Sequence, residues 1–191
     1  MIAAGEGRRL RPITERWPKP ILPIDGKPVI ATLLRELDAA GLQSVTVVVG
    51  HLGEQIRRLL TGLDVRFAVQ PEPLGSADAV GRAVAAGVQA PFVVSVADTV
   101  FAPGAIGRFV EGWGVSGADS AMAPPLWGLG PQLIPLLEDL PGPPYELRVA
   151  FESATSVERL ELPPMRTLTE PADLVVENFV YLEGPHHERD V

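Results

Sequence analysis

The segment from Ala3 to Pro28 concentrates glycines and cations in the order expected of an anion-binding loop. Gly5 and Gly7 have no Cβ, so the backbone can adopt positive φ angles and bring its N–H groups against a bulky anion. Arg8 and Arg9 follow at once, and their guanidinium groups match phosphate oxygens with two parallel hydrogen bonds. This spacing predicts a polyphosphate-binding loop.

A single lysine follows the loop in a rigid setting. Lys19 stands between Pro18 and Pro20. Both prolines fix φ, so the compact ammonium group has little conformational freedom left to lose when it binds an anion. We therefore expect Lys19 to face the same phosphates as the glycine loop.

Two well-known phosphate motifs do not fit this spacing. A dinucleotide-binding fingerprint needs a third glycine three residues after Gly7, but that position is Leu10. A Walker loop needs Gly-Lys-Ser or Gly-Lys-Thr, whereas the Gly26-Lys27 pair is followed by Pro28. The loop therefore belongs to another class of phosphate site.

Composition limits the partners of this site. The chain has 191 residues and no cysteine, which fits one domain over residues 1–191 and excludes disulfides and zinc-thiolate sites. Its formal net charge is −8, although residues 1–27 hold six Lys or Arg against three Asp or Glu. A small basic site on an acidic body suits a small polyanion and argues against nucleic acid or an anionic membrane as the partner. No long apolar run or secretory signal is present, so we expect a cytoplasmic protein.

Apolar runs alternate with amphipathic segments, which predicts β-α-β units and a mostly parallel sheet. The predicted strands are residues 1–4, 45–49, 65–69 and 92–96. The predicted helices are residues 28–40, 52–60 and 76–88, where apolar side chains recur at spacings of three and four. Beyond residue 112, the pattern predicts strands over 118–123 and 157–162 and helices over 129–137, 145–154 and 171–181. We therefore expect an α/β fold.

Polar residues at the carboxyl ends of the predicted strands complete the candidate site, because ligands of open α/β sheets gather at that edge. Asp98 follows the strand over 92–96, where a carboxylate can hold Mg²⁺ against a phosphate. Gln70 follows an earlier strand and offers both a donor and an acceptor to a base edge. Gly75 lets backbone groups approach the plane of a base, whereas Ser76 also fits an ordinary helix N-cap.

These residues resemble the signature of the sugar-1-phosphate nucleotidyltransferases, which join a nucleoside triphosphate to a sugar phosphate. The opening pattern of that family, A-x-G-x-G-T-R-L-x-P-L-T followed by P-K-P and G-K-P, is matched over residues 4–14, 18–20 and 26–28. Residues 70–77 resemble the Q-x-x-P-x-G-T-A element that receives the nucleobase in the family. The resemblance implies a Rossmann-like three-layer sandwich of the nucleotide-diphospho-sugar transferase type.

The resemblance also implies an activity and a role for each residue. The reaction is Mg²⁺-dependent transfer of a nucleotidyl group from a nucleoside triphosphate to a sugar 1-phosphate, with release of pyrophosphate. A homo-oligomer is a further implication. The nucleotide-binding residues implied in this way are Ala4, Gly5, Gly7, Arg8, Gln70, Gly75 and Ser76. The catalytic residues are Arg9, Lys19 and Asp98, with Asp98 as the metal ligand.

Departures from the family pattern leave two other functions open. Arg8 replaces the usual Thr, and the second acidic metal ligand is expected near Thr167, where the chain has no carboxylate. No lysine follows Lys27, so Arg148 is the candidate cation for the sugar phosphate. The alternatives are a non-catalytic nucleotide-binding regulator and a nucleotidyltransferase with a non-sugar phosphorylated acceptor. His51 has no catalytic or metal-binding spacing and is interpreted as a loop residue.

Overall fold

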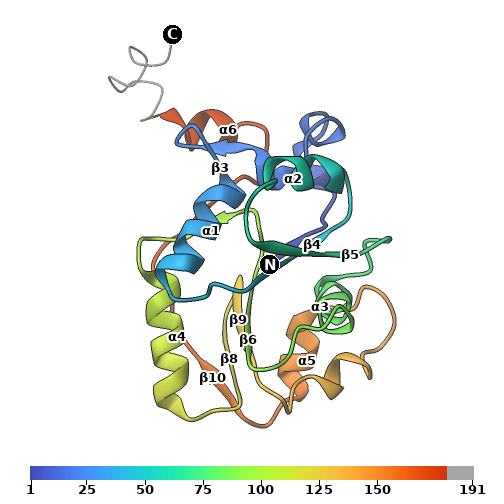
Figure 1. Ribbon diagram of the computed structural model, residues 1–191, viewed down its shortest axis with the longest axis vertical. Coiled ribbons are helices and arrows are strands. Elements are labelled where there is room, and N and C mark those ends of the chain that lie inside the picture. Colours follow the sequence, from blue (N-terminus) through green and yellow to red (C-terminus); the bar gives the residue numbers. More distant parts are fainter. Residues whose placement is uncertain (180–191) are drawn as a thin grey trace.

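Strands and helices alternate along the computed structural model, which describes residues 1–179 (Figure 1). The strands are β1 (Ile2–Ala3), β2 (Pro23–Ile24), β3 (Lys27–Pro28), β4 (Val45–Val49), β5 (Val65–Val69), β6 (Phe92–Ser95), β7 (Thr99–Val100), β8 (Ser120–Ala123), β9 (Leu126–Leu129), β10 (Val157–Arg159) and β11 (Arg166–Thr167). The helices are α1 (Val29–Ala39), α2 (Gly53–Leu59), α3 (Ser76–Ala85), α4 (Ala105–Ser116), α5 (Leu147–Ser153) and α6 (Asp173–Val176). This order confirms the predicted α/β class.

Three parallel strands, in the order β1-β4-β5, form the sheet that leads into the glycine loop. The central strand β4 has the sequence VTVVV, and β-branched residues of this kind suit a strand that is covered on both faces. Because the three strands are parallel, the segments that follow them emerge at one edge of the sheet. The loop after β1, His51 after β4 and Gln70 after β5 therefore share that edge.

A second sheet, in the order β10-β8-β9-β6, is mixed rather than parallel, since β9 runs antiparallel to both of its neighbours. The predicted helix over 129–137 is wrong in its first part, because Leu129 belongs to β9. The chain reverses at Pro124 and Pro125 and returns as a strand between β6 and β8. Only a 3-10 turn over Pro135–Leu137 remains of the predicted helix.

Within residues 1–179, the strands form two sheets that are hydrogen-bonded to each other at β1, so the expected central sheet is divided. Ile2 forms an isolated parallel bridge with Val96, and Ala97 N donates a hydrogen bond of 2.8 Å to Ile2 O. Toward the amino ends of the strands, a cavity of about 360 Å³ lies between β4 and β6. Ile2 of β1 is therefore the hydrogen-bonded joint between the two sheets, while α1 and α3 pack against both of them.

Helices cover both faces of the sheets, which gives the predicted three layers (Figure 1). On one face, Val47 and Val49 pack in a cluster with Ile30 of α1 and Ile56 of α2. On the other face, Val48 packs in a cluster with alanines of α3. Alternate residues of β4 thus point to opposite helical layers, as the two-residue period of a strand requires.

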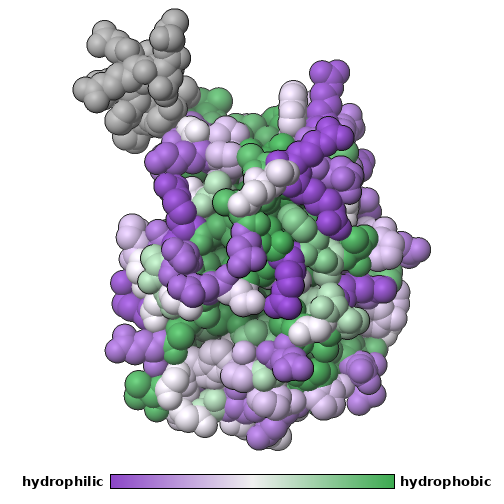
Figure 2. All heavy atoms as spheres, in the orientation of Figure 1, coloured by the Kyte–Doolittle hydropathy of each residue, from purple (hydrophilic) through white to green (hydrophobic). Residues whose placement is uncertain are grey.

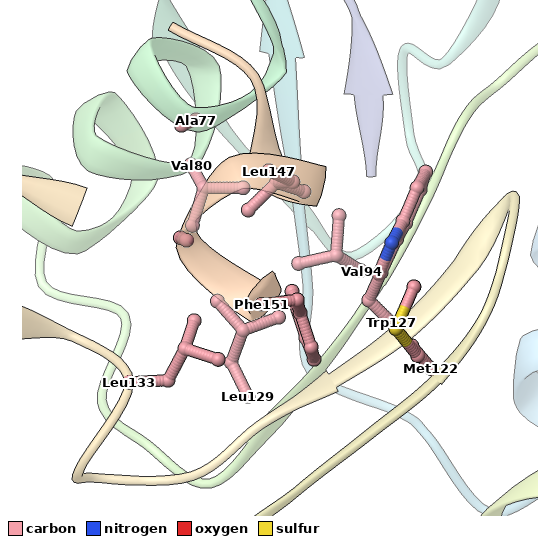
Figure 3. Packing of buried hydrophobic residues seen from close by; sticks show 10 residues of the cluster. Ala77, Val80, Val94, Met122, Trp127, Leu129, Leu133, Leu147 and Phe151 are labelled. Atoms are coloured by element: carbon pink, nitrogen blue, oxygen red, sulfur yellow. The ribbon is translucent and has the colours of Figure 1, made fainter. Parts of the chain in front are cut away.

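A further cluster packs α3 and α5 against the mixed sheet (Figure 3). Leu147 and Phe151 of α5 are almost completely buried against Val94, Trp127 and Leu129. The predicted helix over 145–154 is therefore present, as α5, with its apolar side toward the sheet.

The last described segment returns to the edge that carries the glycine loop. β11 pairs antiparallel with β7, and the four-residue α6 follows. The predicted helix over 171–181 is thus shorter in its described part, and residues 180 and 181 lie outside the described residues. Asn178 is 6% exposed, and its Nδ2 donates to Pro23 O and Leu174 O at 2.9 and 2.8 Å, which fastens this segment to β2.

Candidate functional site

The glycine loop, Lys19 and Asp98 line one cleft with a volume of about 320 Å³. The loop follows β1, whereas Asp98 lies between β6 and β7. The predicted residues that line the cleft are Gly5, Gly7, Arg8, Arg9, Lys19 and Asp98. Ala4 lies directly before the loop and is buried, at 4% exposure. On the molecular surface, long hydrophilic side chains project from the end that carries α2 and β3 (Figure 2).

The two glycines of the loop play different conformational roles. Gly7 has a φ of +62°, and a Cβ added there would lie 2.8 Å from Cγ2 of Thr14. Gly5 does not adopt a positive φ, and a Cβ added there would meet no atom within 4 Å. The expectation of a left-handed conformation is therefore correct for Gly7 and wrong for Gly5, which instead leaves open space beside the cleft.

The arginines stand on a 3-10 turn over Arg8–Leu10 whose third residue is anchored in the protein. Leu10 is 1% exposed, so the turn is held while both guanidinium groups remain on the surface. Arg8 pairs with Glu6 and thereby lowers the pKa of that carboxyl. Within residues 1–179, Arg9 takes part in no ion pair. Arg9 therefore offers its full charge to an anion in the cleft.

Lys19 and Asp98 form an ion pair within the cleft. The side chains are 13% and 29% exposed, so the pair is partly shielded from water but remains accessible to a ligand. Thr99 Oγ1 donates to the second carboxylate oxygen of Asp98 at 3.3 Å. The carboxylate is thus oriented by a cation on one side and by a hydroxyl on the other.

Strand β11 supports Asp98 and brings one unexpected residue to the cleft. Thr167 Oγ1 donates a hydrogen bond of 3.0 Å to the backbone oxygen of Asp98. Thr169, two residues further on, lines the cleft, although sequence reasoning placed the expected metal-ligand position near Thr167. Thr167 lies opposite Thr99 in the β11–β7 ladder, whereas Thr169 lies beyond the end of β11.

Asp173 lies four residues after Thr169, and its carboxylate is engaged by the backbone of the intervening segment. Its Oδ2 accepts hydrogen bonds from the N–H groups of Thr169 and Glu170 at 2.6 and 2.8 Å. These bonds lower the pKa of Asp173, with a smaller contribution from the charge of Lys19. Asp173 therefore shapes the segment that carries Thr169.

Gln70 is buried, at 5% exposure, and its amide group is held by its own loop. Its Nε2 donates to Gly75 O at 2.9 Å and to Asp78 Oδ2 at 2.8 Å. Both amide hydrogens are thus engaged, which leaves the carbonyl oxygen as the group that can meet a ligand. Gln70 does not line the cleft of the glycine loop.

Gly75 and Ser76 are fixed by the segment that leads into α5. Gly75 has a φ of +110°, and a Cβ added there would lie 2.3 Å from Tyr145 O. Ser76 begins α3 but does not cap it, so the N-cap interpretation is wrong. Its Oγ instead accepts a hydrogen bond of 2.9 Å from Leu147 N, the first residue of α5, and donates to Glu146 at 2.6 Å.

Arg148, the candidate cation for a sugar phosphate, lies on the surface of α5. Its side chain is 68% exposed and pairs with Glu152, one turn further along the same helix. Arg148 does not line the cleft of the glycine loop. The structure therefore does not bring it together with Lys19 and Asp98.

The cleft fits a hard divalent cation that arrives with a phosphate ligand. Among residues 1–179, no three His, Asp, Glu or Cys side chains gather as a preformed metal cage. Asp98 is the acidic residue that lines the cleft. Mg²⁺ is commonly held by one or two carboxylates together with substrate phosphates and water, so a single carboxylate is sufficient.

None of the helices within the described residues combines the length and the apolar character needed to cross a membrane.

Solved structures share the architecture around this cleft. UDP-glucose pyrophosphorylase from Acinetobacter baumanii superimposes with a TM-score of 0.82 over 97% of this chain and 93% of that chain, at 17% sequence identity. HddC from Yersinia pseudotuberculosis, solved with GMP-PN, gives a TM-score of 0.74 over 94% of this chain and 97% of that chain, at 18% identity. These likenesses confirm the expected fold.

Curated relatives match part of this chain in sequence. The low-salt glycan biosynthesis nucleotidyltransferase Agl11 of Haloferax volcanii is 35% identical over 112 residues, which are 56% of this chain and 31% of that protein. The N-acetylmuramate alpha-1-phosphate uridylyltransferase of Neisseria meningitidis serogroup B is 38% identical over 84 residues, which are 42% of this chain and 36% of that protein. The matches thus span about a third of the length of these relatives.

The sequence model of the MobA-like NTP transferase domain matches residues 1–151, from β1 to α5. This range contains the glycine loop, Lys19, Gln70 and Asp98, and the resemblance to nucleotidyltransferases is thereby confirmed. The chain belongs to the MobA-like NTP transferase family.

Proposed function

We propose that the protein transfers a nucleotidyl group from a nucleoside triphosphate to a sugar 1-phosphate, giving an NDP-sugar and pyrophosphate. The observation that carries this proposal is the convergence of Gly5, Gly7, Arg9, Lys19 and Asp98 on one cleft. Backbone N–H groups, two kinds of cation and one carboxylate are the groups that a metal-bound triphosphate requires.

In the proposed reaction, a phosphate oxygen of the sugar 1-phosphate attacks the α-phosphorus of the nucleotide. A new P–O bond forms, and the bond from the α-phosphorus to the oxygen shared with the β-phosphorus breaks. Pyrophosphate leaves with that electron pair. No covalent intermediate on the protein is needed, so the protein contributes positioning and charge neutralisation.

The residues of the cleft divide these tasks. The loop from Gly5 to Arg9 holds the triphosphate, and Lys19 neutralises charge that develops on the phosphate oxygens. Asp98 would hold Mg²⁺, which when bound neutralises phosphate charge and orients the leaving group. Gln70 and Gly75 lie outside the lining of this cleft and would face the nucleobase, with the carbonyl oxygen of Gln70 as an acceptor.

The names of the relatives support nucleotidyl transfer and favour a sugar phosphate as the acceptor. One curated relative is named as a nucleotidyltransferase of glycan biosynthesis and another as a uridylyltransferase of a sugar 1-phosphate. The position of Arg148 outside the cleft favours the alternatives, a regulator without turnover or an enzyme for another phosphorylated acceptor.

The organisation of residues 1–191 as a single domain and the assembly into a homo-oligomer stay predictions.

The test is a matrix of substrates in which the release of pyrophosphate is measured. ATP, GTP, CTP, UTP and dTTP are each combined with Mg²⁺ and with sugar 1-phosphates or non-sugar phosphates. We expect turnover with at least one sugar 1-phosphate. Turnover with non-sugar acceptors alone would show that the acceptor is a non-sugar phosphate. Nucleotide binding without turnover in every combination would favour a non-catalytic nucleotide-binding regulator.

Asp98→Asn tests the metal assignment in the same assay. We expect this substitution to abolish Mg²⁺-dependent pyrophosphate release while the thermal unfolding transition is retained. Asp38→Asn is the matched control, because Asp38 is an exposed acid on α1 that does not line the cleft. An active Asp98→Asn protein would refute the role of Asp98.

A further inference from the structure

His51 contacts the chain on both sides of the glycine loop, at Ala4 before it and at Thr14 after it. It is half-buried and lies two residues after the end of β4. Its backbone N–H donates to Ala4 O, just before the loop, at 3.4 Å. Its ring Nε2 lies 2.8 Å from Thr14 O, just after the arginines. A carbonyl oxygen can only accept, so this ring nitrogen carries the hydrogen and donates it.

Thr14 passes this contact on to the centre of the loop. It is 1% exposed, and its Oγ1 donates a hydrogen bond of 2.8 Å to Gly7 O. Its methyl group also occupies the space that a side chain at position 7 would need. The position of Thr14 therefore sets the position of the left-handed turn at Gly7.

A second tether from the same region lies nearby. Gln55 Nε2, on α2, donates to Arg16 O at 2.8 Å. This contact fastens the chain beyond Thr14 but reaches neither Ala4 nor Gly7. Among the described residues, His51 is thus the one that hydrogen-bonds both ends of the loop, Ala4 through its backbone N–H and Thr14 through its ring.

We propose that His51 is a positioning residue for the triphosphate: it holds the two ends of the loop at a fixed separation, so that the N–H groups and Arg9 meet the phosphates already arranged. This proposal rests on the proposed nucleotide-binding function of the cleft. Pre-arranged donors lose less freedom on binding and stabilise charge more strongly than mobile ones. His51 touches no reacting atom in this role.

Four proteins test the proposal: the unchanged protein, His51→Ala, His51→Gln and His51→Asn. The amide nitrogen of Gln can take the place of ring Nε2, whereas the shorter Asn reaches only the place of Nδ1. Binding of the five nucleoside triphosphates with Mg²⁺ is measured by calorimetry. We expect His51→Ala and His51→Asn to weaken binding about tenfold, as the loss of one hydrogen bond predicts, and His51→Gln to restore it.

Trypsin provides a readout that requires neither binding nor turnover. Arg8 and Arg9 are exposed on the loop, so cleavage after them reports how firmly the loop is held. We expect cleavage there to be about tenfold faster in His51→Ala and His51→Asn than in His51→Gln, with equal thermal unfolding temperatures. If His51→Ala does not fold, the comparison of His51→Asn with His51→Gln decides whether the ring Nε2 contact holds the loop.

The outcomes separate the two proposals. If no triphosphate binds any of the four proteins, the proposed function fails, while the trypsin rates still decide whether His51 holds the loop. Equal cleavage in all four proteins would overturn the positioning role. So would a His51→Asn protein that binds and resists trypsin as well as His51→Gln does.

Discussion

The ammonium group of Lys19 donates a hydrogen bond to the carboxylate of Asp98, 79 positions away along the chain. Lys19 stands on a 3-10 turn that begins after Pro18, and Asp98 follows β6. The contact thus joins the segment after the glycine loop to the second sheet. Because the two side chains orient one another, neither is an independent component of the site.

Substitution of Lys19 by Met removes the cation and leaves the carboxylate without its partner. We expect turnover to fall about 100-fold to 1,000-fold, as for other preorganised donors to charge that develops in a transition state. The rate of pyrophosphate release at saturating nucleotide measures this effect. Lys27→Met is the matched control, since Lys27 is exposed on β3 and does not line the cleft. Equal losses in both variants would contradict a specific role for Lys19.

Gly75→Ala should destabilise the protein, because the added Cβ would lie 2.3 Å from Tyr145 O at a φ of +110°. Strained backbone of this kind costs about 1–3 kcal/mol. Urea denaturation measures the change in the free energy of unfolding. Gly81→Ala is the control within α3, where a Cβ would meet nothing within 4 Å. Gly81→Ala should stabilise the helix by about 0.5–1 kcal/mol. A loss of stability in this variant would show that the space around a glycine does not by itself determine the effect of its substitution by alanine.

The Asp25–Arg166 pair should make stability depend on pH. The Arg166 guanidinium hydrogen-bonds the Asp25 carboxyl and holds its pKa below its usual value. A carboxyl with a lowered folded-state pKa contributes stability that is present above about pH 4, the range of an unfolded Asp, and is lost as pH falls through the folded value.

Asp25→Asn removes this contribution, and its effect is measured by urea denaturation at pH 7 and pH 2. Both side chains are more than 40% exposed, so the pair stabilises the fold by only about 0.2–1 kcal/mol. We expect Asp25→Asn to lose this amount at pH 7 and almost nothing at pH 2. A loss of the same size at both pH values would show that the carboxyl contributes through packing instead of charge.

Local sequence predicted the first half of the fold well. The valines of β4 and the three- and four-residue spacing of apolar side chains in α1 gave both elements almost to the residue. In contrast, β9 is a strand because β6 and β8 flank it, and pairing of this kind is not encoded in its own four residues. The Gly-rich sequence around Leu129 carries no local signal for it.

The candidate site likewise combines residues that local sequence predicts with residues whose roles depend on distant parts of the chain. Gly5, Gly7, Arg9, Lys19 and Asp98 could be chosen from residue type and spacing, and they do line one cleft. The role of Ser76 could not be predicted, because a serine hydroxyl at the start of a helix can hydrogen-bond to its own helix or to another helix equally well. Its partner, Leu147, lies 71 positions away. Thr169 was missed for a similar reason, since the pairing of β11 with β7 brings this segment to the cleft from a distant part of the chain.

The joint between the two sheets at β1 has a consequence for the cleft. The glycine loop continues from this joint, whereas Asp98 belongs to the chain beyond β6, on the other side of it. Helices α1 and α3 each pack against both sheets, so this joint is covered on both of its faces. A triphosphate bound by both the loop and Asp98 would therefore contact both sheets at once, and the packing that fixes one sheet against the other also sets the distance between these two phosphate-binding groups.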